Sequence, residues 1–218
     1  MADSFSITVS VLALAVSATT AWLTLFRRGT VRMTQPTVIY FGPDAVRYDA
    51  SFKPRPALPK IYLRTLLFST SKRGRVVESI HVSLSRNETH QNFNIWVYGE
   101  DKLVRGSGLF VGESGITANH HFLAPNDVGH TYRFVAGTYR LDVFAKLLGE
   151  NKRKQLFTQS LEVSQESAAL LDKPGNGLYF DWGPDASRYQ SHIDFRQPPP
   201  EIEQKIPGLF GPRTTDES

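Results

Sequence analysis

The chain has 218 residues, of which 25 are Lys or Arg and 21 are Asp or Glu, and its formal net charge is +4. It contains no cysteine, which excludes disulfides, thiolate metal sites and a cysteine nucleophile. Charges of both signs are spread along the chain, so they do not predict nucleic-acid binding, and no motif predicts a cofactor. The length suits one membrane anchor and one soluble domain of roughly 170 residues.

An apolar segment opens the chain and predicts a single transmembrane helix. No charged residue other than Asp3 precedes Arg27, and the uncharged stretch exceeds the ~20 residues that cross a bilayer core. We expect residues 1–28 to be an uncleaved anchor in the cell membrane, because no Lys or Arg precedes the apolar run as it does in a signal peptide. Arg27, Arg28 and Arg32 follow the helix, so the positive-inside rule predicts an external N-terminus and a cytoplasmic domain.

Small and hydroxylated residues recur along one face of this helix at alternating steps of three and four. Small residues let helices approach closely in lipid, so this face predicts association with a second copy or with another membrane protein. The alternative is that each hydroxyl bonds back to its own helix, as Ser and Thr do in a single span. The residues expected to form the contact are Ser10, Ala13, Ser17 and Ala21.

After the anchor the hydropathy pattern changes from helical to alternating, which predicts strands. A juxtamembrane linker, residues 29–36, leads to a mainly β domain over residues 37–196. Eight short strands separated by turn residues favour a β-sandwich. The predicted strands are 37–41, 61–69, 75–84, 92–98, 108–111, 116–123, 138–147 and 155–163.

The apolar pattern also predicts the register of one hairpin. In this register the residue numbers of each pair, one from strand 75–84 and one from strand 92–98, add up to 175. Val82 then lies opposite Phe93 on the core face. The opposite face is a candidate platform for a sugar or a peptide, although we favour its being covered by another segment. That face carries His81, Asn94, Trp96 and Tyr98.

Tyr139 follows a turn glycine at the start of the next-to-last predicted strand. It resembles the corner tyrosine of immunoglobulin-like sandwiches, and this resemblance predicts that fold without predicting a function. A short helix is predicted over residues 164–172, with a serine cap and a Pro-Gly stop. The proline-rich tail, residues 197–218, is predicted to be disordered, and it is either a peptide for a partner or a solvated end.

The sequence Gly-Pro-Asp-Ala-x-Arg-Tyr begins at Gly42 and again at Gly183. Gly-Pro-Asp is turn chemistry, so the first interpretation is two turns that end strands. The second is that the two segments lie side by side and form a binding surface, because the chain ends of a domain are often close. The residues predicted to bind are Asp44, Arg47, Tyr48, Asp185, Arg188 and Tyr189, with Trp96 and Trp182.

Three histidines are the candidate metal ligands or catalytic groups. His120 and His121 are adjacent in a predicted strand, so they point to opposite faces and cannot both bind one metal. With His192 and Asp185, one of them could complete a three-ligand site or an acid/base pair. The alternative, which we favour, is that these are surface or hydrogen-bonded histidines and that no metal is bound.

The segments at residues 107–112 and 180–185, with the helix followed by Arg-Arg, resemble a group of bacterial membrane-anchored proteins of unknown function. The resemblance spans nearly the whole chain and implies no activity. Three hypotheses therefore remain. The first is a membrane-tethered module that binds a protein partner or a second copy of the chain. The second is a metal-dependent or acid/base enzyme. The third is a carbohydrate-binding domain that lies outside the cell.

Overall fold

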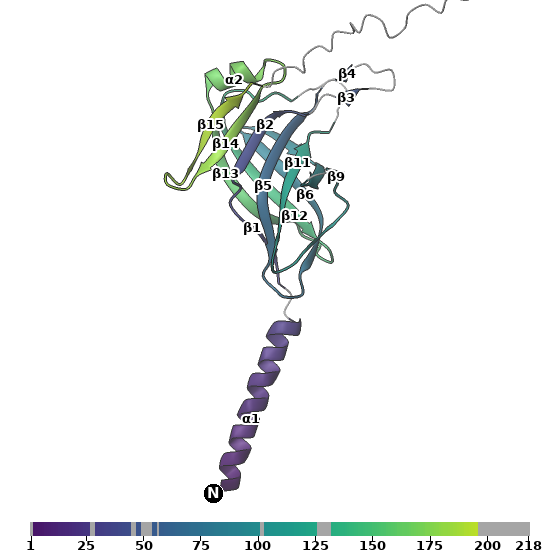
Figure 1. The fold of residues 1–218 in the computed structure, drawn as a ribbon, viewed down its shortest axis with the longest axis vertical. Helices are drawn as coiled ribbons and strands as arrows, with labels where there is room; N and C mark the ends of the chain where they lie inside the picture. The colour runs from purple at the N-terminus through teal and green to yellow at the C-terminus, as the bar shows by residue number, and fades with distance from the viewer. Residues whose placement is uncertain are drawn as a thin grey trace, which may run out of the picture.

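The computed structural model describes residues 2–26, 29–44, 47–48, 54–55, 57–100, 103–125 and 132–195. Within them, one apolar helix precedes a domain built mainly of antiparallel strands (Figure 1). The first helix is α1 (Ala2–Ala21), which continues as the π-helical turn η1 (Trp22–Phe26), and the second is α2 (Gln165–Leu171). The prediction of a mainly β chain with one N-terminal apolar helix is confirmed.

The described strands form two main sheets and one small hairpin, β3–β4. The larger sheet has the order β15, β14, β2, β5, β11, β8 and β9, and β1 also pairs with β5. The smaller sheet has the order β10, β6, β12 and β13, and β7 also pairs with β6. The bounds are β1 Val31–Met33, β2 Val38–Pro43, β3 Arg47–Tyr48, β4 Pro54–Arg55, β5 Pro59–Ser69, β6 Arg75–Arg86, β7 Thr89–Phe93, β8 Ile95–Gly99, β9 Val104–Arg105, β10 Leu109–Val111, β11 Ile116–Leu123, β12 Gly137–Leu147, β13 Lys154–Val163, β14 Gly177–Gly183 and β15 Arg188–Asp194.

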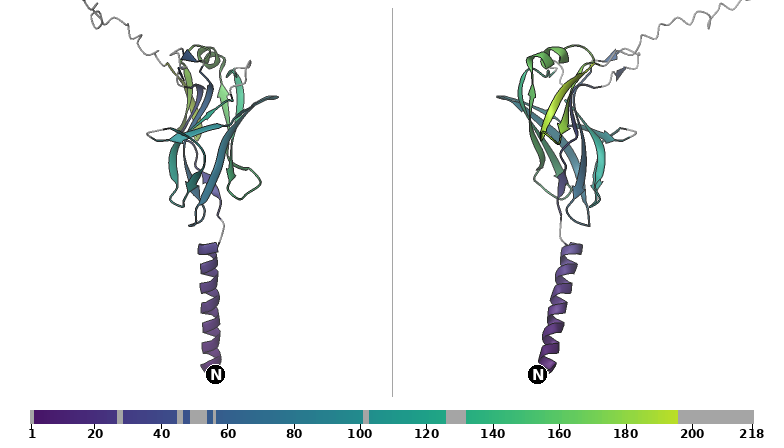
Figure 2. Two further views of the ribbon diagram at one scale, coloured as in Figure 1. Left: turned by 90° about the vertical axis from the view of Figure 1, so that its right-hand side faces the viewer. Right: turned by 60° about the vertical axis from the view of Figure 1, so that its left-hand side comes forward.

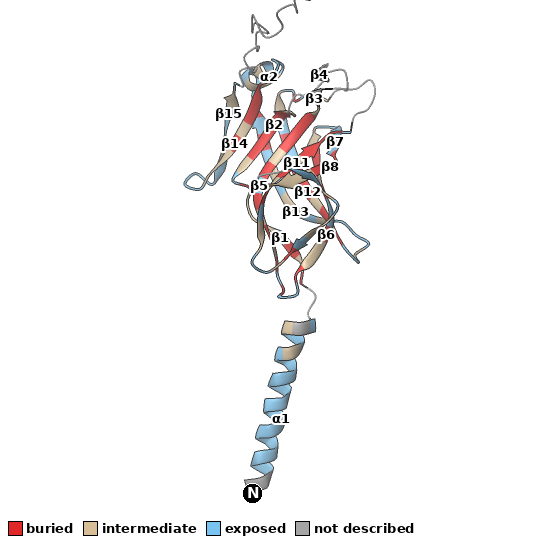
Figure 3. Ribbon diagram, turned by 45° about the vertical axis from the view of Figure 1, so that its right-hand side comes forward, coloured by how far each residue is buried: buried red, intermediate tan, exposed pale blue. Residues whose placement is uncertain are grey.

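The two sheets pack face to face around one apolar core (Figure 2). Successive residues of a strand point to opposite faces, so the alternating pattern places every second side chain inside. In β5, Ile61 and Leu63 are fully buried, and in the smaller sheet Val82 and Leu141 face them across the core. Buried residues, red in Figure 3, alternate with intermediate and exposed ones along the strands of both sheets.

Tyr139 makes the contacts that its position at the start of β12 predicts. Its hydroxyl donates to the carbonyl of Val135 at 2.7 Å and accepts from the N–H of the same residue at 2.9 Å. Its ring is fully buried and meets Phe41 of the other sheet edge-on, with the ring centroids 5.9 Å apart. Tyr139 therefore fixes the segment that leads into β12 against the core.

The strand predicted over residues 92–98 is two strands in two different sheets. The predicted register holds in β7, where Val82 pairs with Phe93. At Asn94 the chain leaves the smaller sheet, and β8 joins the larger one beside β11. Trp96 consequently faces the core and is 4% exposed. Trp96 and Tyr98 therefore do not share the predicted outer face with His81 and Asn94, because the change of sheet turns β8 over.

The segment predicted as a linker, residues 29–36, contains β1. Val31 is fully buried and pairs with Ser69 at the end of β5. A three-residue strand is too short to produce an alternating signal in the sequence. The residues that follow the anchor thus belong to the domain core. The hairpin of β14 and β15, at the edge of the larger sheet, was likewise not among the predicted strands.

Candidate functional site: a cleft at the end of the domain

The N-terminal helix is exposed along its length in the described structure (Figure 3). Among the described residues, Ser4–Thr24 is the one helix long and apolar enough to cross a membrane by length and composition. The hydroxyls of Ser10 and Thr20 donate to the carbonyls four residues earlier, at 2.9 and 2.8 Å. These hydroxyls are satisfied within the helix, as in the self-bonding interpretation of its small-residue face.

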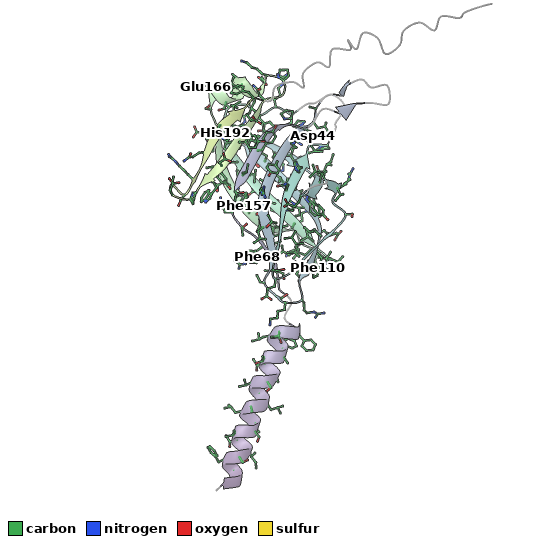
Figure 4. All side chains as sticks on the ribbon, in the orientation of Figure 1. Asp44, Phe68, Phe110, Phe157, Glu166 and His192 are labelled. Carbon is green, nitrogen blue, oxygen red and sulfur yellow. The ribbon has the colours of Figure 1, made fainter. Side chains whose placement is uncertain are left out.

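A cleft of about 540 Å³ lies at the opposite end of the domain from the residues that follow the anchor. β5 connects the two ends, since its first residue, Pro59, lines the cleft and its last, Ser69, pairs with Val31. An 11-residue strand spans about 33 Å. Figure 4 labels Asp44 at the cleft end. The cleft is lined by residues 42–44, 57, 59, 132–134 and 171–175.

The base of the cleft is aromatic. Phe134 is buried and stacks on Phe41 with the ring centroids 5.0 Å apart. Tyr132 meets Phe134 edge-on at 5.3 Å and Phe93 at 5.7 Å. Burial, followed by the neighbouring Tyr139 hydroxyl, raises the pKa of Tyr132 far above its usual value. The Tyr132 hydroxyl therefore stays protonated and provides a polar tip beside a broad apolar surface.

One rim of the cleft is the segment after α2, and local hydrogen bonds fix its shape. The Ser164 hydroxyl caps the helix by accepting from the N–H of Ser167 at 3.1 Å. At the other end, the Asn176 side-chain amide donates to the carbonyl of Leu170 at 2.9 Å. Gly175 has a φ of 84°, which favours glycine, and it turns the chain toward β14. This rim is therefore built into the fold.

Charges of both signs surround the aromatic base. The Nζ of Lys60, a buried residue, lies 3.7 Å from the Asp44 carboxylate. Arg133, Asp172 and Lys173 are exposed at the rim. An apolar base with a few polar groups at its edge is typical of a binding site. Because the rim carries both signs, the cleft suits an apolar peptide better than a strongly charged ligand.

The structure does not bring the two Gly-Pro-Asp turns together. β2 and β14 are neighbours, with Tyr40 paired to Tyr179, but they are antiparallel. The turns therefore lie at opposite ends of the strand pair, roughly 20 Å apart. Asp44 reaches the cleft, whereas Asp185 is exposed in the turn between β14 and β15. The side chains of the predicted residues Arg47 and Tyr48 lie outside the described residues.

The second Gly-Pro-Asp-Ala-x-Arg-Tyr segment ends in Tyr189, which bonds the hairpin of β14 and β15 to the segment before β2. The Tyr189 hydroxyl donates to the carbonyl of Pro36 at 2.7 Å and accepts from the Gln35 amide at 2.9 Å. Its ring meets Trp182 edge-on at 5.1 Å, whereas Arg188 is exposed. Burial raises the pKa of Tyr189 well above its usual value. These contacts are those of a structural residue, and they lie away from the cleft.

His120 and His121 lie on opposite faces of β11, as adjacent strand residues must. The Trp96 indole N–H donates to Nδ1 of His120 at 3.1 Å, inside the core. Burial, with a smaller contribution from His121, lowers the pKa of His120 to about 4. His121 packs against Tyr62 on the other face, with the ring centroids 4.9 Å apart. Each histidine therefore has a packing role of its own.

His192 lies on β15, four strands away from β11 in the same sheet (Figure 4). At about 4.8 Å per strand the separation is roughly 19 Å. Its Nδ1 lies 3.2 Å from the carboxylate of Asp181, on the neighbouring β14. The described residues contain no cluster of three metal-binding side chains. The structure thus does not assemble His120 or His121 with His192 and Asp185.

Among the described residues, Asp44 is the one predicted site residue that lines the cleft. The aromatic base and the rim, residues 132–134 and 171–175, come from segments between strands, where hydropathy carries no period. The one available signal was the sequence Tyr-Arg-Phe at 132–134, an aromatic pair next to a charge outside any predicted strand.

Comparison with protein-family models gives no match. Comparison with curated proteins gives no match either. Among solved structures, the chain is similar to the CooA pilin subunit from enterotoxigenic Escherichia coli. The two share 15% sequence identity with a TM-score of 0.30, over 62% of this chain and 97% of the pilin. So low a score establishes neither a common fold nor a common role.

Proposed function

We propose that this chain is a membrane-tethered interaction module that presents the cleft, and with it a protein-binding site, on the side facing away from the bilayer. The observation that carries the proposal is the position of the cleft. It lies at the far end of β5 from Val31, which follows directly on the anchor. A helix through the bilayer would therefore hold the cleft about 33 Å beyond the point where the domain begins.

The proposed location is the cell membrane, with the helix Ser4–Thr24 as a single span. The exposed apolar surface of this helix supports the proposal, because such a surface is stable in lipid and not in water. The cationic residues Arg27, Arg28 and Arg32 follow the span, so we place the N-terminus outside and the domain in the cytoplasm. A reporter enzyme fused after Ser218 that is active only outside the membrane would reverse this topology.

The domain is proposed to be an immunoglobulin-like sandwich. Two face-to-face antiparallel sheets and the bond from Tyr139 to the backbone four residues earlier support this assignment. Such sandwiches bind partners at the ends of their sheets as well as on their faces, and the cleft occupies one end. The fold itself specifies no ligand, so the proposal depends on the cleft.

The chemistry of the cleft favours a peptide segment of a protein. The aromatic side chains of Tyr132 and Phe134 offer flat apolar contact area, and Arg133 and Lys173 stand at the edge. Buried aromatic groups bordered by exposed charges are the usual composition of a peptide-binding groove.

Site-specific crosslinking in membranes tests the proposal. A photo-crosslinking amino acid in place of Lys173, at the rim, is expected to capture a protein partner. The matched control is Lys72, also an exposed lysine, in the turn at the opposite end. Ala57→Trp narrows the cleft and is expected to abolish the adduct at 173. Adducts that are identical at positions 72 and 173, or unchanged by Ala57→Trp, would rule the cleft out.

The small-residue face of the helix carries a second, separable proposal of self-association within the membrane. Ser10, Ser17 and Ala13 are exposed on the helix, and their small size permits close contact with a second helix. Ser17→Leu is expected to reduce crosslinked oligomers of the full-length chain in membranes. Unchanged oligomers would leave the anchor as a tether alone and would not affect the cleft.

A further inference from the structure

We infer that the anchor end of the domain docks on the bilayer surface and binds anionic lipid headgroups. The docking surface is formed by two loops, residues 70–74 and 148–153, and by an apolar row beside them, and we call it the basal face. The inference depends on the proposed function for the membrane span. It goes beyond that function because it gives the domain a second contact with the membrane.

The chain enters the domain at Thr30, which is bonded to both loops. Its N–H donates to the Thr70 hydroxyl at 2.9 Å, and its carbonyl accepts from the Thr70 N–H at 2.9 Å. The Thr30 hydroxyl accepts from Nζ of Lys154, the residue that follows the second loop. Both loops therefore lie next to the point where the membrane helix is attached.

The covalent link is too short to keep this end of the domain far from the lipid. Phe26, the last residue of η1, is four positions from Thr30. Four residues span at most about 14 Å, and the headgroup region on each side of a bilayer core is roughly 5 to 8 Å thick. If the helix crosses the core up to Phe26, Thr30 lies within about 10 Å of the headgroup surface.

The exposed charges of the two loops are cationic. The one acidic residue in their sequences, Glu150, pairs with Nη2 of Arg75 at 2.6 Å. Glu113 is exposed in the neighbouring loop, so the balance at this end stays positive. Each Lys or Arg near an anionic membrane strengthens binding about five-fold. The exposed cations of the two loops are Lys72, Arg73, Lys152 and Arg153.

Three apolar side chains form a row across the outer face of the smaller sheet at this end. Phe110 pairs with Val76, and the N–H of Leu148 donates to the Val76 carbonyl at 2.9 Å. Phe110 and Leu148 are 59% and 60% exposed. Val77 and Leu147, which precede or follow them along the strands, are fully buried, so the row faces outward.

A polar pair limits the row on the side away from the anchor. Glu78 lies two residues along β6 from Val76 and pairs with Lys146 at 2.9 Å. Figure 4 labels Phe110 at the end of the domain nearest the helix, and a Cβ on Gly74 of the first loop would meet its ring at 2.5 Å. Phe and Leu beside Lys and Arg are the combination by which amphipathic helices bind the headgroup region.

A second contact with the membrane would define the direction of the domain. A single attachment through the helix leaves the domain free to tilt, and an aromatic cleft could then enter the lipid. The cleft lies at the far end of β5 from Val31. Docking of the basal face therefore keeps Tyr132 and Phe134 away from the bilayer and available to a partner.

The full-length chain in vesicles tests the inference. The chain has no cysteine, so Asn151→Cys places a single fluorescent label in the second loop, and Asp172→Cys places the control label at the cleft end. The vesicles contain phosphatidylcholine alone or mixed with phosphatidylglycerol, and both carry a nitroxide quencher at headgroup depth. We expect quenching at position 151 to be about three-fold stronger with the anionic lipid and to decrease in high salt. Quenching at position 172 should stay low in both.

Charge variants assign the contact to the basal face. Lys72→Gln with Arg73→Gln is expected to reduce quenching at position 151 to the value in neutral vesicles. The matched control, Arg133→Gln with Lys173→Gln, removes the same charge at the cleft end and should leave the quenching unchanged. Phe110→Ser is expected to reduce it by about half and to leave its dependence on anionic lipid.

Three results would overturn the inference. Equal quenching at position 151 in the two lipids would mean that the headgroup charge is not bound. Equal losses in the two charge pairs would assign the effect to net charge, and equal quenching at positions 151 and 172 would mean that neither end is preferred. All the substituted side chains are exposed, and unchanged near-UV circular dichroism guards against misfolding.

Flotation of the same vesicles after an alkaline wash separates this inference from the proposed membrane span. Protein that stays with the vesicles and shows equal quenching in both lipids has a span and no lipid-binding face. Protein that is washed off lacks the span, which would overturn the proposed tether and this inference with it.

Discussion

The two ends of the domain are built differently. At the anchor end, Gly29 is buried against Ser71, its carbonyl accepts from Arg75 at 3.0 Å, and Arg75 in turn pairs with Glu150 at 2.6 Å. At the cleft end, the sheets are bridged by aromatic rings beneath an open space of about 540 Å³. The domain is thus tightly closed where the chain enters it and open where the chain leaves it. The tightly packed region and the proposed binding site thus lie at opposite ends.

The largest expected change in unfolding free energy comes from His120 in the core, which both ends of the domain share. The effects expected at the two ends are smaller. The fold lowers the pKa of His120 from 6.5 to about 4. Between these two pH values His120 is protonated in the unfolded chain and neutral in the native state. The contribution of His120 to stability is complete above pH 6.5 and is lost as the pH drops toward 4, by about 3 kcal/mol for this one group. Denaturant unfolding of the full chain at several pH values measures the loss.

His120→Gln keeps an acceptor for Trp96 and is expected to remove only part of the acid-induced loss of stability, because burial and Lys60 also lower the pKa of His121 to about 4. It should also lower stability at neutral pH. His192→Gln is the control, because His192 is an exposed residue and the pH dependence should persist in full. A pH dependence unchanged in His120→Gln would assign the acid sensitivity to His121 alone.

The next effect tests how tightly the anchor end is closed. A Cβ on Gly29 would lie 2.6 Å from the backbone nitrogen of Ser71, so Gly29→Ala must displace backbone. We expect a loss of about 2 kcal/mol of unfolding free energy. The matched control is Gly112→Ala, where the nearest atom is 3.8 Å away and the expected change is below ~0.5 kcal/mol. Equal losses would contradict the tight packing of Gly29 against Ser71.

A smaller effect is expected from the ion pair at the same end. Arg75→Ala leaves the buried carbonyl of Gly29 without its donor, which costs about 1.5 kcal/mol. Lys146 pairs with Glu78 at 2.9 Å on the surface, and Lys146→Ala is expected to cost less than ~0.5 kcal/mol. Urea midpoints of the two variants compare them directly. If the surface pair proves the more costly, the closed anchor end is not a source of stability.

The smallest effect is expected at the open end. Lys173→Ala removes an exposed side chain at the rim, and the unfolding free energy should change by less than ~0.5 kcal/mol. Partner capture by a crosslinker at Ala57 should nevertheless fall several-fold if the rim charge orients a peptide. A large loss of stability would show that the rim supports the fold and would weaken its assignment to binding.

The fold could be predicted wherever a regular pattern runs over many residues. The N-terminal helix, β11 and α2 were predicted to within a residue or two, because an uncharged apolar run, an alternating pattern and a serine cap specify them. The change of sheet at Asn94 could not be found, since the alternation of β7 and β8 continues through it without a glycine or a proline. Its cause is long-range pairing with β11, which no local pattern reports.

The site was less predictable than the fold for a related reason. Asp44 was identified through the repeated Gly-Pro-Asp sequence, yet the repeat suggested a partner surface with Asp185 that antiparallel pairing keeps apart. Phe134 and Leu171 acquire their role because two segments far apart in the sequence meet at one end of the sandwich. Such a meeting depends on topology, and only the folded chain displays it.

The pairing of β1 with β5 has a mechanical consequence. Three residue pairs, from Val31 with Ser69 to Met33 with Leu67, join the two strands, and Thr30 adds a reciprocal pair of bonds with Thr70. In the proposed arrangement, a pull between a bilayer and a partner held at the cleft would act along these strands, across hydrogen bonds that lie perpendicular to it. Such bonds share the load and must break together. The pairing of β1 with β5 would then resist separation of the domain from the N-terminal helix.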